Sequence, residues 1–251
     1  MTRPAAVWPD AAAAFYAACL DRSDYAATVG RALRQALAPA TTLLDIGAGS
    51  GLLGRAMLQP GGRWTAVEPN AHMRGRLAGA AGVVRPRVID AAWESLPQLA
   101  RHDVVLCANI PGPIDRPRML LQVCRPLARR AVAWVVPAQP GPRGPCLAGL
   151  LPAHLHGEDE TPGVDLTLAA LPSDERPDQR IDVDWTFRAL FADQAAARRY
   201  FTDQYGDRLG DDRALDAVLA PHLKAVAGGL QAEARKRSAI LIWTASGETD
   251  R

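Results

Sequence analysis

Short apolar runs alternate with stretches of helical spacing through the first half of the chain. Five runs are rich in β-branched and aliphatic residues, which predicts five buried strands. They occupy residues 41–46, 63–68, 83–90, 103–109 and 131–136. Between most of them, apolar residues recur every three or four positions, as in helices that bury one face. Alternating strands and helices build a doubly wound, mostly parallel sheet, so the pattern predicts an α/β fold.

The rhythm changes after the fifth strand. Alternating apolar positions predict a strand at 181–190. Helical spacing predicts helices at 191–205 and 211–234, with breaks near residues 206–210 and at Gly228-Gly229. The apolar run at 238–245 predicts the last strand. The complete sheet is therefore predicted to be seven-stranded.

The length of 251 residues suits a single domain (1–251) with one large core. Amphipathic stretches ahead of the first strand predict two helices, with Asp10 and Ser23 as their N-caps. The predicted parts are an N-terminal helical cap (1–40), a sheet core (41–136), a helical C-terminal insertion (137–236) and the last strand (237–246).

Charge and cysteine content argue against several classes of protein. The net charge of +2 gives no strong field towards nucleic acid or membranes, so neither is an expected partner. Four cysteines without a CxxC pair do not suggest a zinc site or a disulfide framework. No apolar run approaches about 18 residues, and the first ten residues lack a signal-peptide pattern. A soluble cytoplasmic protein is expected, and the sequence does not determine its oligomeric state.

The stretch TTLLDIGAGSGLLG at 41–54 is the candidate ligand site. Asp45 lies near the end of the first strand, and Gly47, Gly49 and Gly51 follow at alternate positions before helical spacing resumes. A strand, a glycine turn and a helix in this order bring bare backbone N–H groups close to a ligand. The stretch therefore predicts a binding loop at the carboxyl end of the first strand.

Two ligands compete for this loop. Residues 49–54 satisfy G-x-G-x-x-G, and Glu68 lies fourteen residues beyond, which fits a dinucleotide. That fingerprint, however, begins immediately after its strand, whereas Asp45-Ile-Gly-Ala intervenes here. A carboxylate at Asp45 also repels a pyrophosphate and suits a positively charged ligand. The residues therefore favour the cationic ligand.

The motif D-x-G-x-G-x-G at 45–51 resembles the first motif of class I S-adenosylmethionine-dependent methyltransferases. The resemblance covers residues 41–136 well, and 238–245 matches the last, antiparallel strand of that family. It implies a Rossmann-like sheet whose core binds S-adenosylmethionine as cofactor. It also implies transfer of the sulfonium methyl group to a nucleophile.

The resemblance assigns further residues around the cofactor. Glu68, in AVEPN at the end of the second strand, matches the acid that takes both ribose hydroxyls, and two acceptor oxygens suit two adjacent OH donors. Pro69 and Met73 would then lie near the adenine. Many members carry D-A-E-x-L-P after the third strand, and Ala92 and Trp93 begin the segment that aligns with it.

This adenine segment departs from the family pattern. Ala92 stands where those members have an Asp that accepts from the adenine amino group. The backbone N–H of Trp93 remains able to meet the ring, and its indole to pack there. Asp90 lies two residues too early, and whether it replaces the missing carboxylate is left open.

Asn109 ends the fourth strand in CANIPG, where the family places the methyl group and the substrate. Asn-Ile-Pro resembles the N-[LI]-P-[YF] motif of adenine N-methyltransferases. Those enzymes stack a flipped base on the final aromatic residue, and here that residue is Gly112. A small-molecule acceptor is therefore predicted in place of nucleic acid.

The implied reaction needs alignment and a dry pocket more than a protein nucleophile. No residue stands out as general base; His154 and His156 are candidates by position, and they fit no defined metal-ligand frame. The insertion is predicted to shape the acceptor pocket, with residues 191–234 as a lid. The alternatives are an NAD(P)-dependent oxidoreductase and a non-catalytic S-adenosylmethionine-binding subunit.

Overall fold

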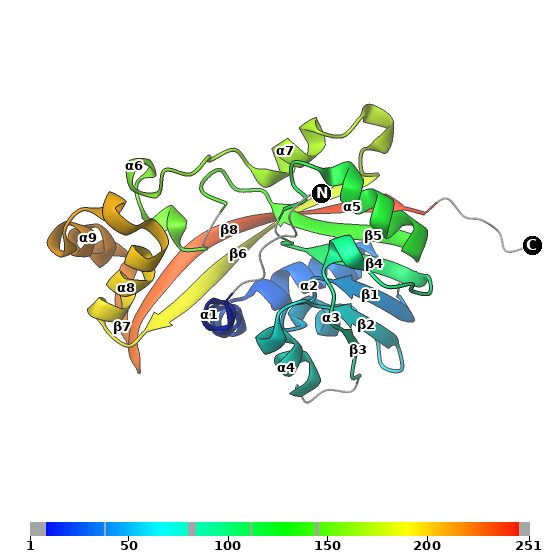
Figure 1. Ribbon diagram of the computed structural model, residues 1–251, viewed down its shortest axis with the longest axis horizontal. Helices are drawn as coiled ribbons and strands as arrows, with labels where there is room; N and C mark the ends of the chain where they lie inside the picture. Colours follow the sequence, from blue (N-terminus) through cyan, green and yellow to red (C-terminus); the bar gives the residue numbers. More distant parts are fainter. Residues whose placement is uncertain (1–8, 38, 80–83, 111, 144–145, 246–251) are drawn as a thin grey trace, which may run out of the picture.

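The computed structural model describes residues 9–37, 39–79, 84–110, 112–143 and 146–245. These residues form one sheet with helices on both of its faces (Figure 1). The strands are β1 (Thr42–Ile46), β2 (Arg63–Val67), β3 (Arg87–Ile89), β4 (His102–Ala108), β5 (Ala128–Pro137), β6 (Gln179–Phe191), β7 (Leu223–Val226) and β8 (Gly229–Thr244). The helices are α1 (Asp10–Arg22), α2 (Tyr25–Ala36), α3 (Leu52–Met57), α4 (Ala71–Gly79), α5 (Pro117–Cys124), α6 (Ala153–His156), α7 (Gly163–Ala169), α8 (Gln194–Tyr205) and α9 (Asp212–Leu219).

The sheet has the order β3-β2-β1-β4-β5-β8-β6, and β7 pairs with β8. Strands β1 to β5 run parallel, whereas β8 is antiparallel to both β5 and β6. The predicted α/β class with a doubly wound, mostly parallel sheet is confirmed. Ile46 pairs with Val67 on one side and Cys107 on the other, so the carboxyl ends of β1, β2 and β4 meet at one edge.

Two apolar cores lie on the two faces of this sheet, because successive side chains of a strand point to opposite faces. In β1, Leu43 belongs to the core with α2 and α3, and Leu44 to the core with α5. Figure 1 shows α2, α3 and α4 on one side of the sheet and α5 and α7 on the other. The burial of all of β1, of residues 104–107 of β4 and of residues 131–136 of β5 follows from this double cover.

The last two strands extend well beyond the core sheet. β6 and β8 pair along their length, whereas β5 covers only residues 238–244 of β8. The remainder, with β7, forms an arm that carries α8 and α9 at its far end (Figure 1).

The prediction of a helix at 211–234 is wrong. Helix α9 ends at Leu219, and a hairpin of β7 and β8 follows. Val226 pairs with Gly229 across a two-residue turn, in which Gly228 has a φ of +87°. Gly229 has a φ of +142°, and a Cβ there would lie 2.0 Å from the Phe191 carbonyl oxygen. The glycine pair therefore starts a hairpin, and the last strand begins at Gly229 instead of residue 237.

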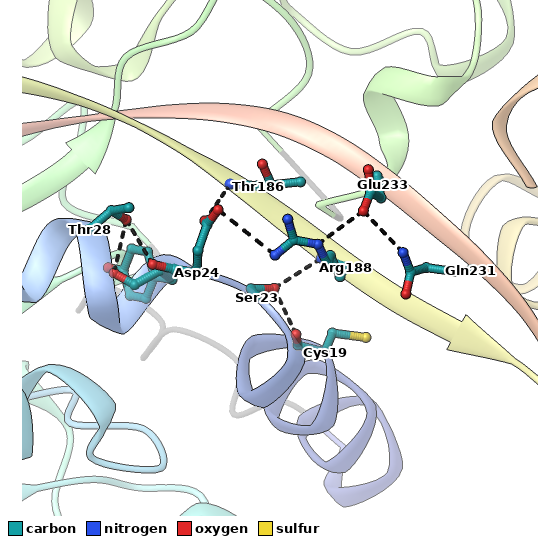
Figure 2. A network of polar contacts seen from close by, with 9 residues as sticks. Cys19, Ser23, Asp24, Thr28, Thr186, Arg188, Gln231 and Glu233 are labelled. Atoms are coloured by element: carbon teal, nitrogen blue, oxygen red, sulfur yellow. Dashed lines mark hydrogen bonds and ion pairs between the residues drawn. The ribbon is translucent and has the colours of Figure 1, made fainter. Parts of the chain in front are cut away.

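The α1–α2 turn is bonded to the open edge of β6, the last strand in the sheet order. Asp24 Oδ1 accepts a hydrogen bond from the Thr186 N–H at 2.7 Å, and Ser23 Oγ accepts one from the Arg188 N–H at 2.9 Å (Figure 2). The Ser23 hydroxyl donates to the Cys19 carbonyl oxygen. Ser23 was predicted to cap the second helix. Its hydroxyl oxygen instead accepts from the N–H of a residue on the edge strand. Edge N–H groups that would otherwise be open are satisfied in this way.

An ion-pair network continues from this turn across the arm. The Arg188 guanidinium is 3.0 Å from Glu233 on β8 and 3.8 Å from Asp24 (Figure 2). The N-terminal helices are thereby fixed to the sheet at one end, while α1 packs against β6 and α4. Among the described helices, none combines the length and apolar character needed to cross a membrane.

Candidate functional site

A cleft lies at the carboxyl ends of β1, β2 and β4 and is covered by the N-terminal helices. Its lining comes from α1, α2 and the turns that follow these three strands and β3. Within the described part of the chain, no lining residue belongs to 137–236. In an open α/β sheet this edge is where ligands bind, and β1 and β4 flank the point where the strand order reverses.

The glycine turn forms the floor of the cleft. Gly47, Gly49 and Gly51 have φ values of +68°, +56° and +79°, a conformation that favours glycine. Gly47 and Gly49 line the cleft, but Gly51 does not. A Cβ on Gly51 would lie 2.6 Å from Leu77 and 2.7 Å from Trp64, so this glycine allows close packing behind the turn.

Glu68 closes the side of the cleft at the end of β2. It is 7% exposed; its Oε2 accepts from the Gly49 N–H at 2.7 Å, and its Oε1 from the Asn70 N–H at 2.8 Å. Asn70 in turn caps α4, because its Oδ1 accepts from the Met73 N–H, and its Nδ2 donates to Asp10 on α1. The sequence analysis missed Asn70, although an Asn directly before the first residue of a helix is an N-cap signal.

Asp45 is the most deeply buried acid of the cleft, at 2% exposed. Its Oδ2 has no hydrogen-bond partner in the described structure. Burial raises the pKa of Asp45 to about 7; the negative charge of Glu68 adds to the rise, and Arg55 and Trp64 oppose it. The pKa of Glu68 is raised as well, also chiefly by burial. Two neighbouring buried carboxylates make this end of the cleft a site for positive charge.

The predicted adenine wall is assembled at the far side of Glu68. Pro69, Met73, Ala92 and Trp93 all line the cleft. Trp93 is 6% exposed, and its indole N–H is buried without a partner in the described structure. Trp93–Ser95 forms a single 3-10 turn.

Two acids near this wall differ in their placement. Asp90 pairs with Arg74 at 2.8 Å, is largely exposed and does not line the cleft. Asp90 is thus not placed at the cleft in the way that the missing carboxylate would require. Glu94 does line the cleft, and the sequence analysis did not single it out.

Asn109 and two tyrosines form the opposite end of the cleft. Asn109 has a φ of +50°, and its Nδ2 donates to the Tyr25 hydroxyl oxygen at 2.9 Å. Tyr25 lies on α2 and Tyr16 on α1, and both line the cleft. Burial raises the pKa of each phenol, so both hydroxyls are neutral at physiological pH. The contact joins residues 84 positions apart, which no local pattern predicts.

The histidines of the insertion lie outside this cleft. His156 is buried, with Nε2 3.3 Å from Glu160 and Nδ1 accepting from the Glu158 N–H. The residues described contain no group of three or more His, Cys, Asp or Glu side chains placed to hold a metal ion. The predicted lid of residues 191–234 contributes no described residue to the cleft, and its helices α8 and α9 sit on the arm (Figure 1). The cover over the cleft is α1 and α2 instead.

The chain is similar over most of its length to several solved structures. A candidate type II methyltransferase from Anaeromyxobacter dehalogenans is 21% identical, with a TM-score of 0.50, and the match covers 99% of this chain and 100% of that one. The YcgJ protein from Bacillus subtilis is 16% identical, with a TM-score of 0.48, and the match covers 87% of this chain and 98% of that one. A candidate methyltransferase from Bacillus halodurans is 11% identical, with a TM-score of 0.47, and the match covers 86% of this chain and 97% of that one.

No protein-family model matches the chain, and no curated protein sequence matches it. The full-length likeness to the Anaeromyxobacter protein concerns the fold. It agrees with the predicted doubly wound, Rossmann-like sheet.

Proposed function

We propose that this chain is an S-adenosylmethionine-dependent methyltransferase that acts on a small-molecule acceptor. One observation carries the proposal: Asp45 and Glu68, two buried carboxylates on adjacent strand ends, border the same cleft beside a left-handed glycine turn. S-adenosylmethionine carries a sulfonium and an amino group, and a buried carboxylate without a partner suits such a cation.

The residues present fit this cofactor. Asp45 lines the cleft, and its buried Oδ2 has no hydrogen-bond partner within bonding distance in the described structure, so its charge would attract a cationic ligand. Each oxygen of Glu68 accepts one backbone N–H and retains acceptor capacity for a ribose hydroxyl. Met73 and Trp93 supply an apolar wall for a flat base. These placements support the predicted roles, including those of Gly47 and Gly49; Gly51 would act only through packing.

The same turn argues against a dinucleotide. The N–H groups of Gly47 and Ala48 donate to the Val67 carbonyl oxygen, and that of Gly49 donates to Glu68. The Gly51 N–H donates to the Ala48 carbonyl oxygen. Few N–H groups are left to cradle a pyrophosphate, and two carboxylates would repel it.

The chain's own part in the reaction is binding, alignment and exclusion of water. Bound S-adenosylmethionine supplies an electrophilic methyl group. Asp45 and Glu68 fix the charged and polar ends of the ligand, while α1 and α2 cover the cleft and keep it dry. Asn109, held by Tyr25, stands at the end of β4 where an acceptor is positioned. None of the described cleft residues has to form a covalent bond.

The test is calorimetric titration of the purified protein with S-adenosylhomocysteine and, separately, with NADH. We expect S-adenosylhomocysteine to bind and NADH not to compete with it. Glu68→Gln should weaken binding by about 1–3 kcal/mol, the cost of a lost charged hydrogen bond. Asp90→Asn is the matched control, because that nearby acid lies outside the cleft. Displacement of S-adenosylhomocysteine by NADH would favour the oxidoreductase alternative and contradict the proposal.

A further inference from the structure

We propose that the acceptor is an amine or a nitrogen heterocycle, so that its methylated product is a cation. The proposal rests on the methyltransferase function proposed above and concerns the same cleft. Its acceptor end is the part bounded by Asn109, Tyr16 and Tyr25. Three features of the cleft carry the inference: its charge, its aromatic wall and its titratable groups.

The charge of the lining selects against anionic acceptors. Asp45, Glu68 and Glu94 line the cleft, whereas no Arg, Lys or His is among its described lining residues. A carboxylate or phosphate on the acceptor would meet only like charge in a largely apolar enclosure. Lys236 on β8 is buried, but it does not line the cleft, and its titratable neighbours are Cys146 and Glu158. The lining therefore admits neutral or cationic molecules.

Aromatic rings form the wall at the acceptor end. The Tyr25 ring lies 4.6 Å from the Trp185 ring, and the Tyr16 ring lies 6.2 Å from the Phe187 ring, measured between centroids. Trp185 and Phe187, both on β6, thus back the two tyrosines with apolar packing. The faces of such rings attract organic cations, most strongly where water is excluded. Charge that develops on an acceptor nitrogen would therefore be stabilised by this wall.

The titratable groups at this end suit a nucleophile that needs no general base. Burial holds the phenols of Tyr16 and Tyr25 in their neutral form, and the Tyr25 oxygen already accepts from Asn109. Asp45 and Glu68 are engaged by the cofactor under the proposed function. None of the residues that bound the acceptor end is a general base for an alcohol, and Glu94 lines the cleft next to Trp93, on the predicted adenine side. A nitrogen that is already neutral in solution, as in a weakly basic amine or a pyridine-type heterocycle, carries its lone pair without a general base.

The reaction balances without a co-reactant. The nitrogen lone pair forms the new N–C bond as the C–S bond breaks, and sulfur keeps the electrons of the broken bond. Positive charge passes from sulfur to nitrogen, and the product leaves as a cation that keeps any N–H proton. The cleft therefore holds one positive charge before and after transfer, as its carboxylates require.

The first experiment measures binding without turnover. Protein saturated with S-adenosylhomocysteine is titrated with benzyltrimethylammonium, its uncharged isostere neopentylbenzene, and phenylacetate. We expect the cation to bind about tenfold more tightly than the isostere, through the tyrosine rings, and phenylacetate to bind most weakly. Tyr16→Leu should remove the preference and Tyr16→Phe should keep it. Equal binding of cation and isostere, or tighter binding of phenylacetate, would overturn the proposal.

The second experiment follows the label from methyl-labelled S-adenosylmethionine into a cell extract of small molecules. The labelled product, resolved from unreacted cofactor, should be retained by a cation-exchange resin at neutral pH. A neutral or acidic labelled product would overturn the acceptor class while leaving the methyltransferase function intact. S-adenosylhomocysteine affinity is measured first on every variant; failure of that binding would instead refute the proposed function itself.

Discussion

Asp45→Asn should make the protein more stable and its ligand binding weaker. The pKa of Asp45 is about 7 in the fold against an ordinary value of 3.8. Between these values the folded protein keeps a proton that the unfolded chain has lost, so stability falls as pH rises. The cost is complete above pH 7. A difference of about 3 in pKa corresponds to about 4 kcal/mol, as an upper bound. A neutral carboxamide of the same shape avoids that cost.

The pH dependence of the stability difference distinguishes the effect of the buried Asp45 charge from a general effect of the substitution. Urea unfolding of both proteins without ligand, at about pH 5.5 and about pH 8.5, measures the stability difference. The stabilisation by Asp45→Asn should be about 2 kcal/mol larger at the higher pH, since the pKa of about 7 lies between the two conditions. Asp90→Asn should show no such trend, because that acid is exposed and paired with Arg74.

Binding should change in the opposite direction. Asp45→Asn loses the charged acceptor, so S-adenosylmethionine affinity should fall by about 1.5–3 kcal/mol. Gain of stability with loss of binding is the signature of a group held for function. The reasoning would be refuted if Asp45→Asn destabilised the protein equally at both pH values, because the carboxylate would then be satisfied within the fold.

Three further substitutions test the fold and the cleft. Trp93→Ala should lower S-adenosylhomocysteine affinity while the circular dichroism spectrum is retained, and unchanged affinity would make Trp93 a purely structural residue. Gly229→Ala should destabilise the arm in thermal unfolding because its Cβ would meet a carbonyl oxygen at 2.0 Å, whereas Gly149→Ala, with nothing within 4 Å, should not. Asp24→Ala should cost about 1–3 kcal/mol in urea unfolding, because the Thr186 N–H loses its acceptor; no change would show that water replaces it.

The parallel half of the sheet was predictable because each strand is apolar, short and separated by a helical stretch. The arm was not. Helical spacing in 212–219 was extended over Gly228 and Gly229, whose role depends on the approach of Phe191 from a distant strand. The contact with Phe191 determines the structure of that segment, and the spacing of apolar residues does not reveal such a contact.

The site shows the same division. Asp45, Glu68 and the glycine turn follow from one local motif, and the structure brings them to one cleft. Tyr25 contacts Asn109 where the α1–α2 turn is hydrogen-bonded to the edge of β6. No local sequence pattern predicts that contact between the turn and the strand. The expected N-terminal helical cap lines the cleft, whereas the expected lid of residues 191–234 contributes no described residue to it.

The most direct test of the central claim is the proton balance of S-adenosylmethionine binding. Calorimetry at pH 7 in two buffers of different ionisation enthalpy measures the protons released. With a pKa of about 7, Asp45 is half protonated in the free protein, and a bound cation should ionise it fully. The wild-type protein should therefore release about half a proton more than Asp45→Asn. Binding with equal proton release in both proteins, or no binding at all, would contradict a cation held by Asp45.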